Sequence, residues 1–235
     1  MASLPQDLAL AVRRALRSPG PVRVHDLRVA IRRFNQAFAL HSSNRNKAMR
    51  RASKEIMRRA GDVRNLDITI KLVAKLKETK ALQTRLRRRR DAAARHLTSP
   101  LKAWNLPDEL PEATPASARQ AAVRAVTRLF HRAAKARHPK DLHRVRIAAK
   151  KLRYTLEMVA PVYQHMKEIK RLQSDLGRIN DYETARSIIK HESGGRSVLD
   201  QLKDKQRKKI RAFREHWSGT LSDPAAARAW IRKLS

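Results

Sequence analysis

Two histidines, each followed by cations at helical spacing, are the residues of this sequence best suited to bind an anion. The first cluster is His25, Arg28, Arg32 and Arg33, and the second is His143, Arg146, Lys150 and Lys151. Side chains three or four positions apart lie on one face of an α-helix. Guanidinium and ammonium groups donate charge-assisted hydrogen bonds to phosphate oxygens. The two clusters therefore predict two similar rows of cations that bind one kind of polyanion.

Each cluster lies beside an apolar stripe, and the two stripes repeat along the chain. The first stripe has apolar residues at steps of three and four, and each has a counterpart 118 positions later: Val24, Leu27, Ile31, Phe34 and Phe38, then Leu142, Val145, Ala149, Leu152 and Leu156. At 100° per residue, His25, Arg28 and Arg32 lie roughly 115° from the apolar direction, and His143, Arg146 and Lys150 lie at the same angle on the second stripe. We therefore expect these cations to border a groove between packed helices. A solvated face, with the stems of the cations covering the core, is the alternative.

Two further stretches repeat in the same order and indicate an internal duplication. Residues 60–67 match residues 176–183 at an offset of 116, and residues 85–90 with His96 match residues 205–209 with His216 at an offset of 120. Three matches in one order describe a repeated unit whose length changes fall in loops. Gly61 and Gly177 occupy matched positions and predict a helix end or a close approach of helices. Arg64 and Asp67 are three apart and predict an ordinary surface pair.

The periodicity predicts an all-α fold. Helices are expected near 6–17, 22–41, 45–60 (or on toward 78) and 80–97, then near 116–137, 140–159, 165–190 and 196–217. Prolines break the helical pattern between residues 98 and 117, and Pro224 after Asp223 predicts the start of a short closing helix. Short connections favour antiparallel neighbours. We expect two antiparallel four-helix bundles with pseudo-twofold symmetry: residues 1–107, and residues 108–235 with the closing helix.

The charge balance limits the classes of partner. The chain has 55 Lys and Arg against 21 Asp and Glu, a net charge of +34. Such a charge attracts polyanions, so nucleic acid, polyphosphate and an anionic membrane surface are the candidates. There is no cysteine and no run of about 18 apolar residues, which excludes disulfides, cysteine-bound zinc and a membrane span.

Neighbouring helices supply further candidate cations. On the expected third helices these are Lys47, Arg51, Lys54 and Arg58, with Lys167, Lys170 and Arg171; on the fourth helices they are Arg85, Arg88 and Arg89, with Lys205, Lys208 and Lys209. The two histidines can donate to phosphate, make a structural hydrogen bond or bind a metal. Metal is the weakest of the three because no second ligand stands at ligand spacing. We expect a supporting, pH-sensitive role at the edge of the anion site.

Several stretches together resemble the CHAD family, the conserved histidine α-helical domain. They are residues 25–33, 143–154, 61–67 and 172–177. The resemblance implies two four-helix bundles around a basic central pore or groove, binding of inorganic polyphosphate, and association with polyphosphate granules. It also implies that the pore is lined by His25, Arg28, Arg32, Arg33, His143, Arg146, Lys150, Lys151 and Arg153. Asn65 and Asn180 depart from the family pattern in the glycine-containing segment, which weakens any role for that segment.

We therefore expect non-catalytic binding of polyphosphate by a cytoplasmic protein. Phosphoryl transfer ordinarily needs metal-holding carboxylates or a glycine-rich phosphate loop, and neither is evident, so no cofactor or metal is expected. A basic helical protein that binds nucleic acid, without sequence preference, is the alternative. Single strands would need exposed aromatic residues for stacking, whereas Phe34 and Phe38 fall in the apolar stripe.

Overall fold

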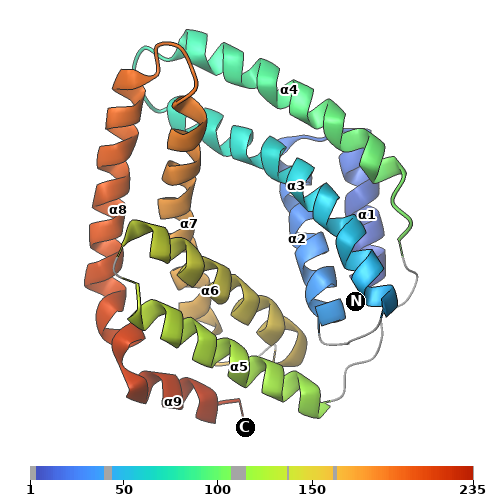
Figure 1. Cartoon of the computed structure of the whole chain (residues 1–235), viewed down its shortest axis with the longest axis vertical. Coiled ribbons are helices and arrows are strands. Elements are labelled where there is room, and N and C mark those ends of the chain that lie inside the picture. Colours follow the sequence, from blue (N-terminus) through green and yellow to red (C-terminus); the bar gives the residue numbers. More distant parts are fainter. Residues whose placement is uncertain (1–3, 40–43, 107–114, 137, 161–162, 235) are drawn as a thin grey trace. The chain divides into compact units, whose positions relative to one another are not determined.

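Helices are the regular elements of this chain wherever the structure describes it. The structure is a computed structural model, and it describes residues 4–39, 44–106, 115–136, 138–160 and 163–234. The helices, in chain order, are α1 (Leu4–Arg17), α2 (Pro21–Ala39), α3 (Asn44–Val73), α4 (Lys80–Lys102), α5 (Pro115–Ala134), α6 (Pro139–Val159), α7 (Met166–Ile189), α8 (Arg196–Ser222) and α9 (Pro224–Arg232) (Figure 1). The predicted all-α class is confirmed. Within these ranges, no helix combines the length and the apolar character that crossing a membrane requires.

The chain forms two compact units that do not simply follow its order. The first unit comprises Met1–Glu112 and Thr184–Leu202, and the second comprises Ala113–Glu183 and Lys203–Ser235. The boundary near residue 112 lies close to the one expected after residue 107. The segment Thr184–Leu202, which ends α7 and begins α8, groups with the first unit. The two predicted repeats are continuous ranges of the sequence, whereas each unit combines two separate ranges.

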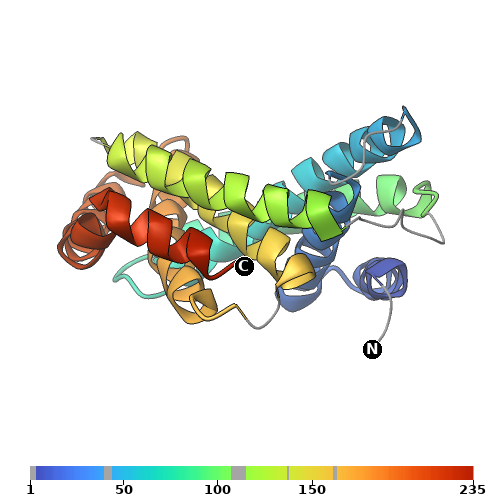
Figure 2. The ribbon, with the colours of Figure 1, turned by 90° about the horizontal axis from the view of Figure 1, so that it is seen from below.

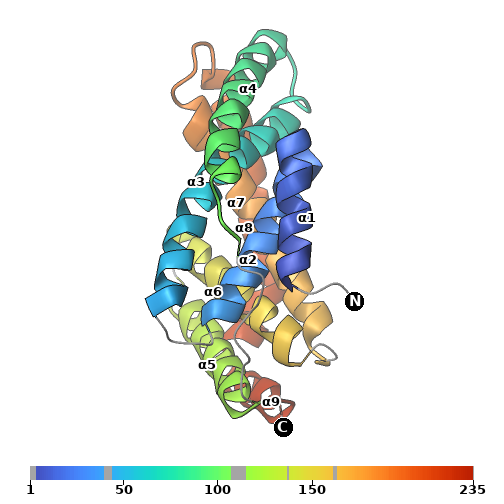
Figure 3. The same ribbon diagram turned by 90° about the vertical axis from the view of Figure 1, so that its right-hand side faces the viewer.

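The first unit is built on helices α1 to α4. Contacts join α1 to α2, α2 to α3, α3 to α4, and α4 back to α1, so the four helices enclose one core (Figure 3). The stripe of α2 is fully buried in it: Val24, Leu27, Ile31 and Phe34. Leu8 of α1, Ile56 of α3 and Leu97 of α4 fill the same core. Burial of this stripe confirms the period predicted from the sequence.

The second unit has its own core, drawn from α5 to α9. The α6 stripe of Val145, Ala149, Leu152 and Leu156 is buried there. Helix α9 packs along α5 (Figure 2), where the rings of Phe130 and Trp230 meet edge to face at 5.2 Å. Asp223 caps α9 by accepting a hydrogen bond of 2.7 Å from the backbone N–H of Ala225. The predicted start of the closing helix is thus confirmed.

One predicted helix end is wrong, because α4 continues through Pro100 to Lys102. Proline lacks the N–H that would bond the carbonyl four residues earlier, which is that of His96. Arg59 of α3 supplies a donor instead, with Nη1 3.0 Å from the His96 oxygen. A contact from a neighbouring helix therefore offsets a defect that the sequence alone predicts to be a break.

The α3–α4 and α7–α8 connections correct one of the predicted offsets. Helix α4 begins at Lys80 and α8 at Arg196, and the left-handed backbone positions before them are Glu78 (φ 56°) and Gly194 (φ 71°). Both pairs are 116 positions apart, the same offset as between residues 60–67 and 176–183. The expected offset of 120 for the fourth helices, and with it the match of His96 to His216, is therefore wrong. Runs of Arg and Lys can be aligned in several registers, whereas a turn fixes only one.

Candidate functional site

On α2, the predicted basic residues lie beside α3. We call His25, Arg28 and Arg32 the α2 row. Arg28 is half-buried, and its Nη1 donates a hydrogen bond of 2.7 Å to the carbonyl of Met57 on α3. Arg32 is also half-buried, while His25 is exposed. The row therefore borders the contact of two packed helices, as the helical wheel predicted. The bond to a neutral carbonyl positions the Arg28 guanidinium without neutralising its charge.

Gly61 makes room for the Arg28 guanidinium. It lies inside α3, so the predicted helix end at this position is wrong. A Cβ atom added there would lie 2.9 Å from Nη1 of Arg28, which is closer than real contacts allow. The glycine thus serves the close approach of a side chain rather than of a second helix. The matched Gly177 has no such neighbour within 4 Å, so this arrangement belongs to the first unit.

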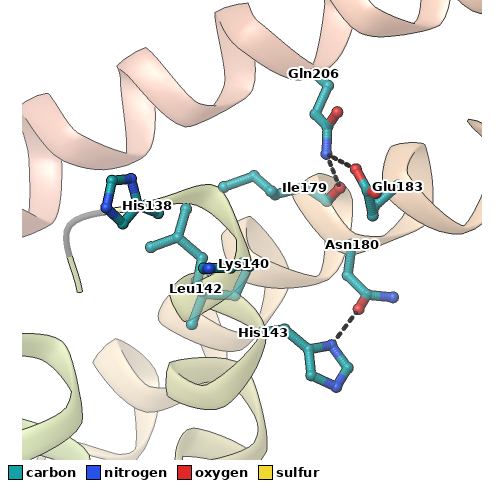
Figure 4. Close-up of a pocket in the computed structure, with 9 residues that line it drawn as sticks. His138, Lys140, Leu142, His143, Ile179, Asn180, Glu183 and Gln206 are labelled. Atoms are coloured by element: carbon teal, nitrogen blue, oxygen red, sulfur yellow. Dashed lines mark hydrogen bonds between the residues drawn. The ribbon is translucent and has the colours of Figure 1, made fainter. Parts of the chain in front are cut away.

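The corresponding row on α6 is held by different groups. We call His143, Arg146 and Lys150 the α6 row. His143 is exposed, and its Nδ1 lies 2.8 Å from Oδ1 of Asn180 on α7 (Figure 4). Because an amide oxygen only accepts hydrogen bonds, Nδ1 bears the proton in this arrangement. Protonation of the ring would then convert Nε2 into a second donor suited to an anion. Asn180, a departure from the family pattern, therefore orients a candidate ligand-binding histidine.

Other predicted residues of α2 and α6 lie away from the two rows or are engaged elsewhere. Arg33 lines a cavity of about 270 Å³ between α1 and α2, together with Asp7 and Asp26, and so faces the opposite flank from Arg28. Arg153 donates to Glu157 at 2.6 Å and to Gln173 at 3.3 Å. Lys151 is exposed. Arg33 therefore lies on a different flank of α2 from Arg28, and Arg153 is held by Glu157 and Gln173.

The cations of α3 and α7 differ in how far their charge is compensated. Arg51 and Lys54 are exposed, as are Lys167 and Lys170 in the first turns of α7. Further along α3, Glu55 accepts hydrogen bonds from Arg58 at 2.8 Å and from Arg59 at 2.6 Å. These bonds, that from Arg58 first, lower the pKa of Glu55 to about 2. Glu55 therefore compensates the charge of Arg58 and Arg59 in part, while Arg51 and Lys54 stand before it on the same helix. Lys47 is in the part of α3 whose side chains are outside the description.

On α4, three neighbouring arginines have three different environments. Arg88 is exposed, as is Lys208 on α8. Arg89 and Arg85 both form ion pairs with Glu192, whose side chain is 8% exposed, and Arg85 also donates to the carbonyl of Ser193 at 2.7 Å. These contacts tie α4 to the segment Thr184–Leu202 within the first unit. Arg89 thus has a structural role that its sequence context did not indicate.

Arg90 forms a buried ion pair that the sequence did not predict. Its Nε lies 3.0 Å from Oδ1 of Asp67, and the two side chains are 15% and 5% exposed. Its Nη2 donates to the carbonyl of Pro19, between α1 and α2. Burial raises the pKa of Asp67 even though Arg90 acts to lower it. The expected surface pairing of Asp67 with Arg64 is therefore wrong. Arg90 follows Leu86 by four residues and precedes Ala94 by four, a position in the apolar stripe that would have predicted its burial.

The second unit contains a cavity with a volume of about 690 Å³, bounded by the start of α6, by α7 and by α8. Two histidines line it: His143 of α6, and His138, the residue just before that helix. Among the residues that the structure describes, no group of three or more histidines and carboxylates is arranged to hold a metal ion.

Comparison with known proteins identifies one family. The model of the CHAD domain matches residues 6–190, which is most of the chain. A crystal structure of the CHAD domain from the plant Ricinus communis is similar in fold, with a TM-score of 0.66 and 17% sequence identity over 98% of this chain and 87% of that one. No curated protein matches the sequence.

Proposed function

Because this chain belongs to the CHAD domain family, we propose that it binds inorganic polyphosphate through the α2 row and the α6 row. One observation supports this proposal above the others. Each row has a histidine and two larger cations at matched positions, and each borders a packed neighbouring helix. A basic surface kept only for solubility would not need the same residues at the same helical positions.

The chemistry of the rows suits an unbranched chain of phosphates. Arg28 and Arg146 are half-buried, so their guanidinium groups are restricted and lose less freedom on binding. Guanidinium groups bond two phosphate oxygens at once, while Lys150 acts as a point charge. Such binding displaces condensed counterions, so the affinity should fall steeply as salt is added. We propose binding without turnover, in the cytoplasm and at polyphosphate granules.

Charge reversal in both rows tests the proposal. The double variant Arg28→Glu with Arg146→Glu should bind long-chain polyphosphate at least ten-fold more weakly, measured by titration at several salt concentrations. The slope of log affinity against log salt should fall by about 1.4, since each lost phosphate contact contributes about 0.7. Circular dichroism reports whether the helices are retained. Unchanged affinity in a helical variant would contradict the proposal.

A matched control separates the rows from the total charge. Lys77→Glu with Lys203→Glu makes the same change in net charge at two exposed lysines outside the rows. This variant should bind polyphosphate within two- to three-fold of the wild type. Equal losses in both double variants would indicate that the net charge, rather than the rows, determines binding.

Competition and turnover test the substrate class and the absence of catalysis. DNA of matched charge should not displace polyphosphate at equal charge concentration. Incubation with polyphosphate and magnesium should release no phosphate. Displacement by DNA would favour a nucleic-acid-binding protein, and phosphate release would favour an enzyme.

A further inference from the structure

Gly61 opens a backbone carbonyl of α3 to the side chain of Arg28. Helices α2 and α3 pack against each other in the first unit (Figure 1). In an α-helix, a carbonyl accepts a hydrogen bond from the N–H four residues later, so the Met57 carbonyl is the acceptor for Gly61. A side chain on the later residue lies over the turn before it and would cover this carbonyl. Glycine leaves the second lone pair of the oxygen accessible, and Nη1 of Arg28 donates to it at 2.7 Å.

The distances from position 61 show which part of Arg28 depends on the glycine. A Cβ atom there would lie 2.9 Å from Nη1, closer than real contacts allow. It would lie 3.8 Å from Cζ and 4.0 Å from Nη2, which are ordinary van der Waals contacts. Nη1 is at the end of a flexible side chain, so the guanidinium can move away from an added Cβ while the helices stay in place. This clash depends only on where Nη1 lies, whatever other groups Arg28 contacts.

We propose that Gly61 is a positioning residue for polyphosphate binding, because it lets the Arg28 guanidinium rest on α3 in one orientation. This role rests on the proposed function of the α2 row. An arginine that is already ordered loses less side-chain freedom when it binds phosphate. Order matters for a guanidinium in particular, since it bonds phosphate oxygens in a planar, directional arrangement. Gly61 has neither a charge nor a side chain, so it acts through Arg28.

The matched Gly177 of α7 shares the sequence context of Gly61 but not its contact. A Cβ atom at Gly177 would meet nothing within 4 Å. Gln173, which matches Met57 at the offset of 116, donates from Nε2 to the carbonyl of Ala149 on α6 at 2.7 Å. In the second unit a side chain of α7 thus bonds a carbonyl of α6, the reverse of the first unit. Gly177 is therefore a matched control for Gly61.

Substitution of each glycine by alanine tests the role of Gly61. In a titration with long-chain polyphosphate at fixed salt concentration, Gly61→Ala should bind about three- to ten-fold more weakly, the cost of ordering one long side chain. Gly177→Ala should bind as the wild type does. Both glycines lie inside helices, so alanine should raise the melting temperature of both variants. Neither variant changes the net charge. Equal affinity of Gly61→Ala and the wild type would overturn the proposal.

The Arg28→Lys background shows whether Gly61 acts through the guanidinium. The lysine side chain ends at the position along the chain that Cζ has in arginine, and an added Cβ would meet that position at 3.8 Å. Arg28→Lys should itself weaken binding, and Gly61→Ala should cause no further loss in this background. A loss by the same factor in both backgrounds would show that Gly61 does not act through Arg28, and would overturn the proposal.

NMR of the arginine side chains measures the order of Arg28 without a ligand, and the Arg28→Lys spectrum identifies its signal. Rotation of the guanidinium should be restricted in the wild type and in Gly177→Ala, and faster in Gly61→Ala. Weaker binding by Gly61→Ala with unchanged rotation of Arg28 would contradict the positioning role.

Failure of this role and failure of polyphosphate binding give different results. If Arg28→Glu with Arg146→Glu binds polyphosphate as the wild type does, the rows are not the binding site and Gly61 positions no binding group. If that double variant loses affinity while Gly61→Ala retains it, the rows still bind polyphosphate, and only the role of Gly61 is overturned.

Discussion

In the first unit, Arg90 of α4 bonds Asp67 of α3 and the carbonyl of Pro19, whereas the matched Gln206 of α8 bonds Glu183 and the carbonyl of Ile179 on α7. Arg28 bonds a carbonyl of α3, while on α6 His143 is held by the amide of Asn180 and Gln173 donates to the carbonyl of Ala149 at 2.7 Å. At the matched positions 90 and 206, an arginine in the first unit thus takes the place of an amide in the second.

This comparison shows that a cation of the sequence can be held by a partner inside its own unit. Arg85, Arg89 and Arg90 bond acidic partners within the first unit, so part of its positive charge is compensated locally. Amides make similar helix–helix bonds without using a cation. Arginines of the second unit form ion pairs as well: Arg144 lies 3.4 Å from Asp141, and Arg153 lies 2.6 Å from Glu157.

The largest effect should come from the buried ion pair. Asp67→Ala removes the buried carboxylate of Arg90 and leaves only the exposed Asp91 at 3.6 Å, so it should lower the free energy of unfolding by about 3 kcal/mol. The matched Glu183→Ala, at an exposed position, should cost about 1 kcal/mol. Urea denaturation measures both.

A transplant of the second-unit pair sharpens this comparison. Asp67→Glu with Arg90→Gln should recover at least half of the stability lost in Asp67→Ala, because amide and carboxylate again satisfy each other. If Asp67→Ala and Glu183→Ala lower the free energy of unfolding by the same amount, the proposed difference between Arg90 and Gln206 is wrong.

The next largest effect should come from the ties to Glu192. Glu192→Gln removes a carboxylate shared by Arg85 and Arg89 and should cost about 2 kcal/mol. Hydrogen exchange should become faster in Thr184–Leu202, which groups with the first unit. The matched position of the first repeat is Leu76, so the α3–α4 turn has no acid at the position of Glu192. Glu215→Gln, at an exposed position of α8, is the control and should leave exchange there unchanged.

A smaller effect is expected at the two left-handed turn positions. Gly194→Ala should cost about 1 kcal/mol, because a side chain disfavours a φ of 71° although the added Cβ would meet nothing within 4 Å. At the matched Glu78, with a φ of 56°, replacement by glycine should be neutral or stabilising by a few tenths of a kcal/mol. Thermal unfolding measures both variants. Melting temperatures that fall in both Gly194→Ala and Glu78→Gly would contradict the match of the turns.

The smallest effect should be a dependence on pH at Asp67. Burial raises its pKa above the usual 3.8, so the folded state holds a proton more readily than the unfolded state does. The resulting stability is fully present below the unfolded pKa and is lost as the pH rises through the folded pKa. The free energy of unfolding of the wild type, relative to Asp67→Asn, should therefore increase as the pH falls from 7 to 4. A decrease would mean that the bond from Arg90 outweighs burial.

The sequence by itself determined the all-α class, the main helices and the two rows. These properties are local: the 3.6-residue period places Val24 and Leu27 on one face and Arg28 on its flank, whatever the rest of the chain does. The turn at Gly194 is also a local feature. Its match to Glu78 was missed because the runs of Arg and Lys were aligned at an offset of 120 instead of 116.

Only the tertiary structure decided which cations are available to a ligand. Arg88, Arg89 and Arg90 are adjacent in sequence, yet one is exposed, one pairs with Glu192 and one is buried against Asp67. Glu192 is 103 positions from Arg89, and Asp67 is 23 positions from Arg90, so no local sequence pattern predicts these partners. Whether a charge is compensated depends on the groups that folding brings within hydrogen-bond distance.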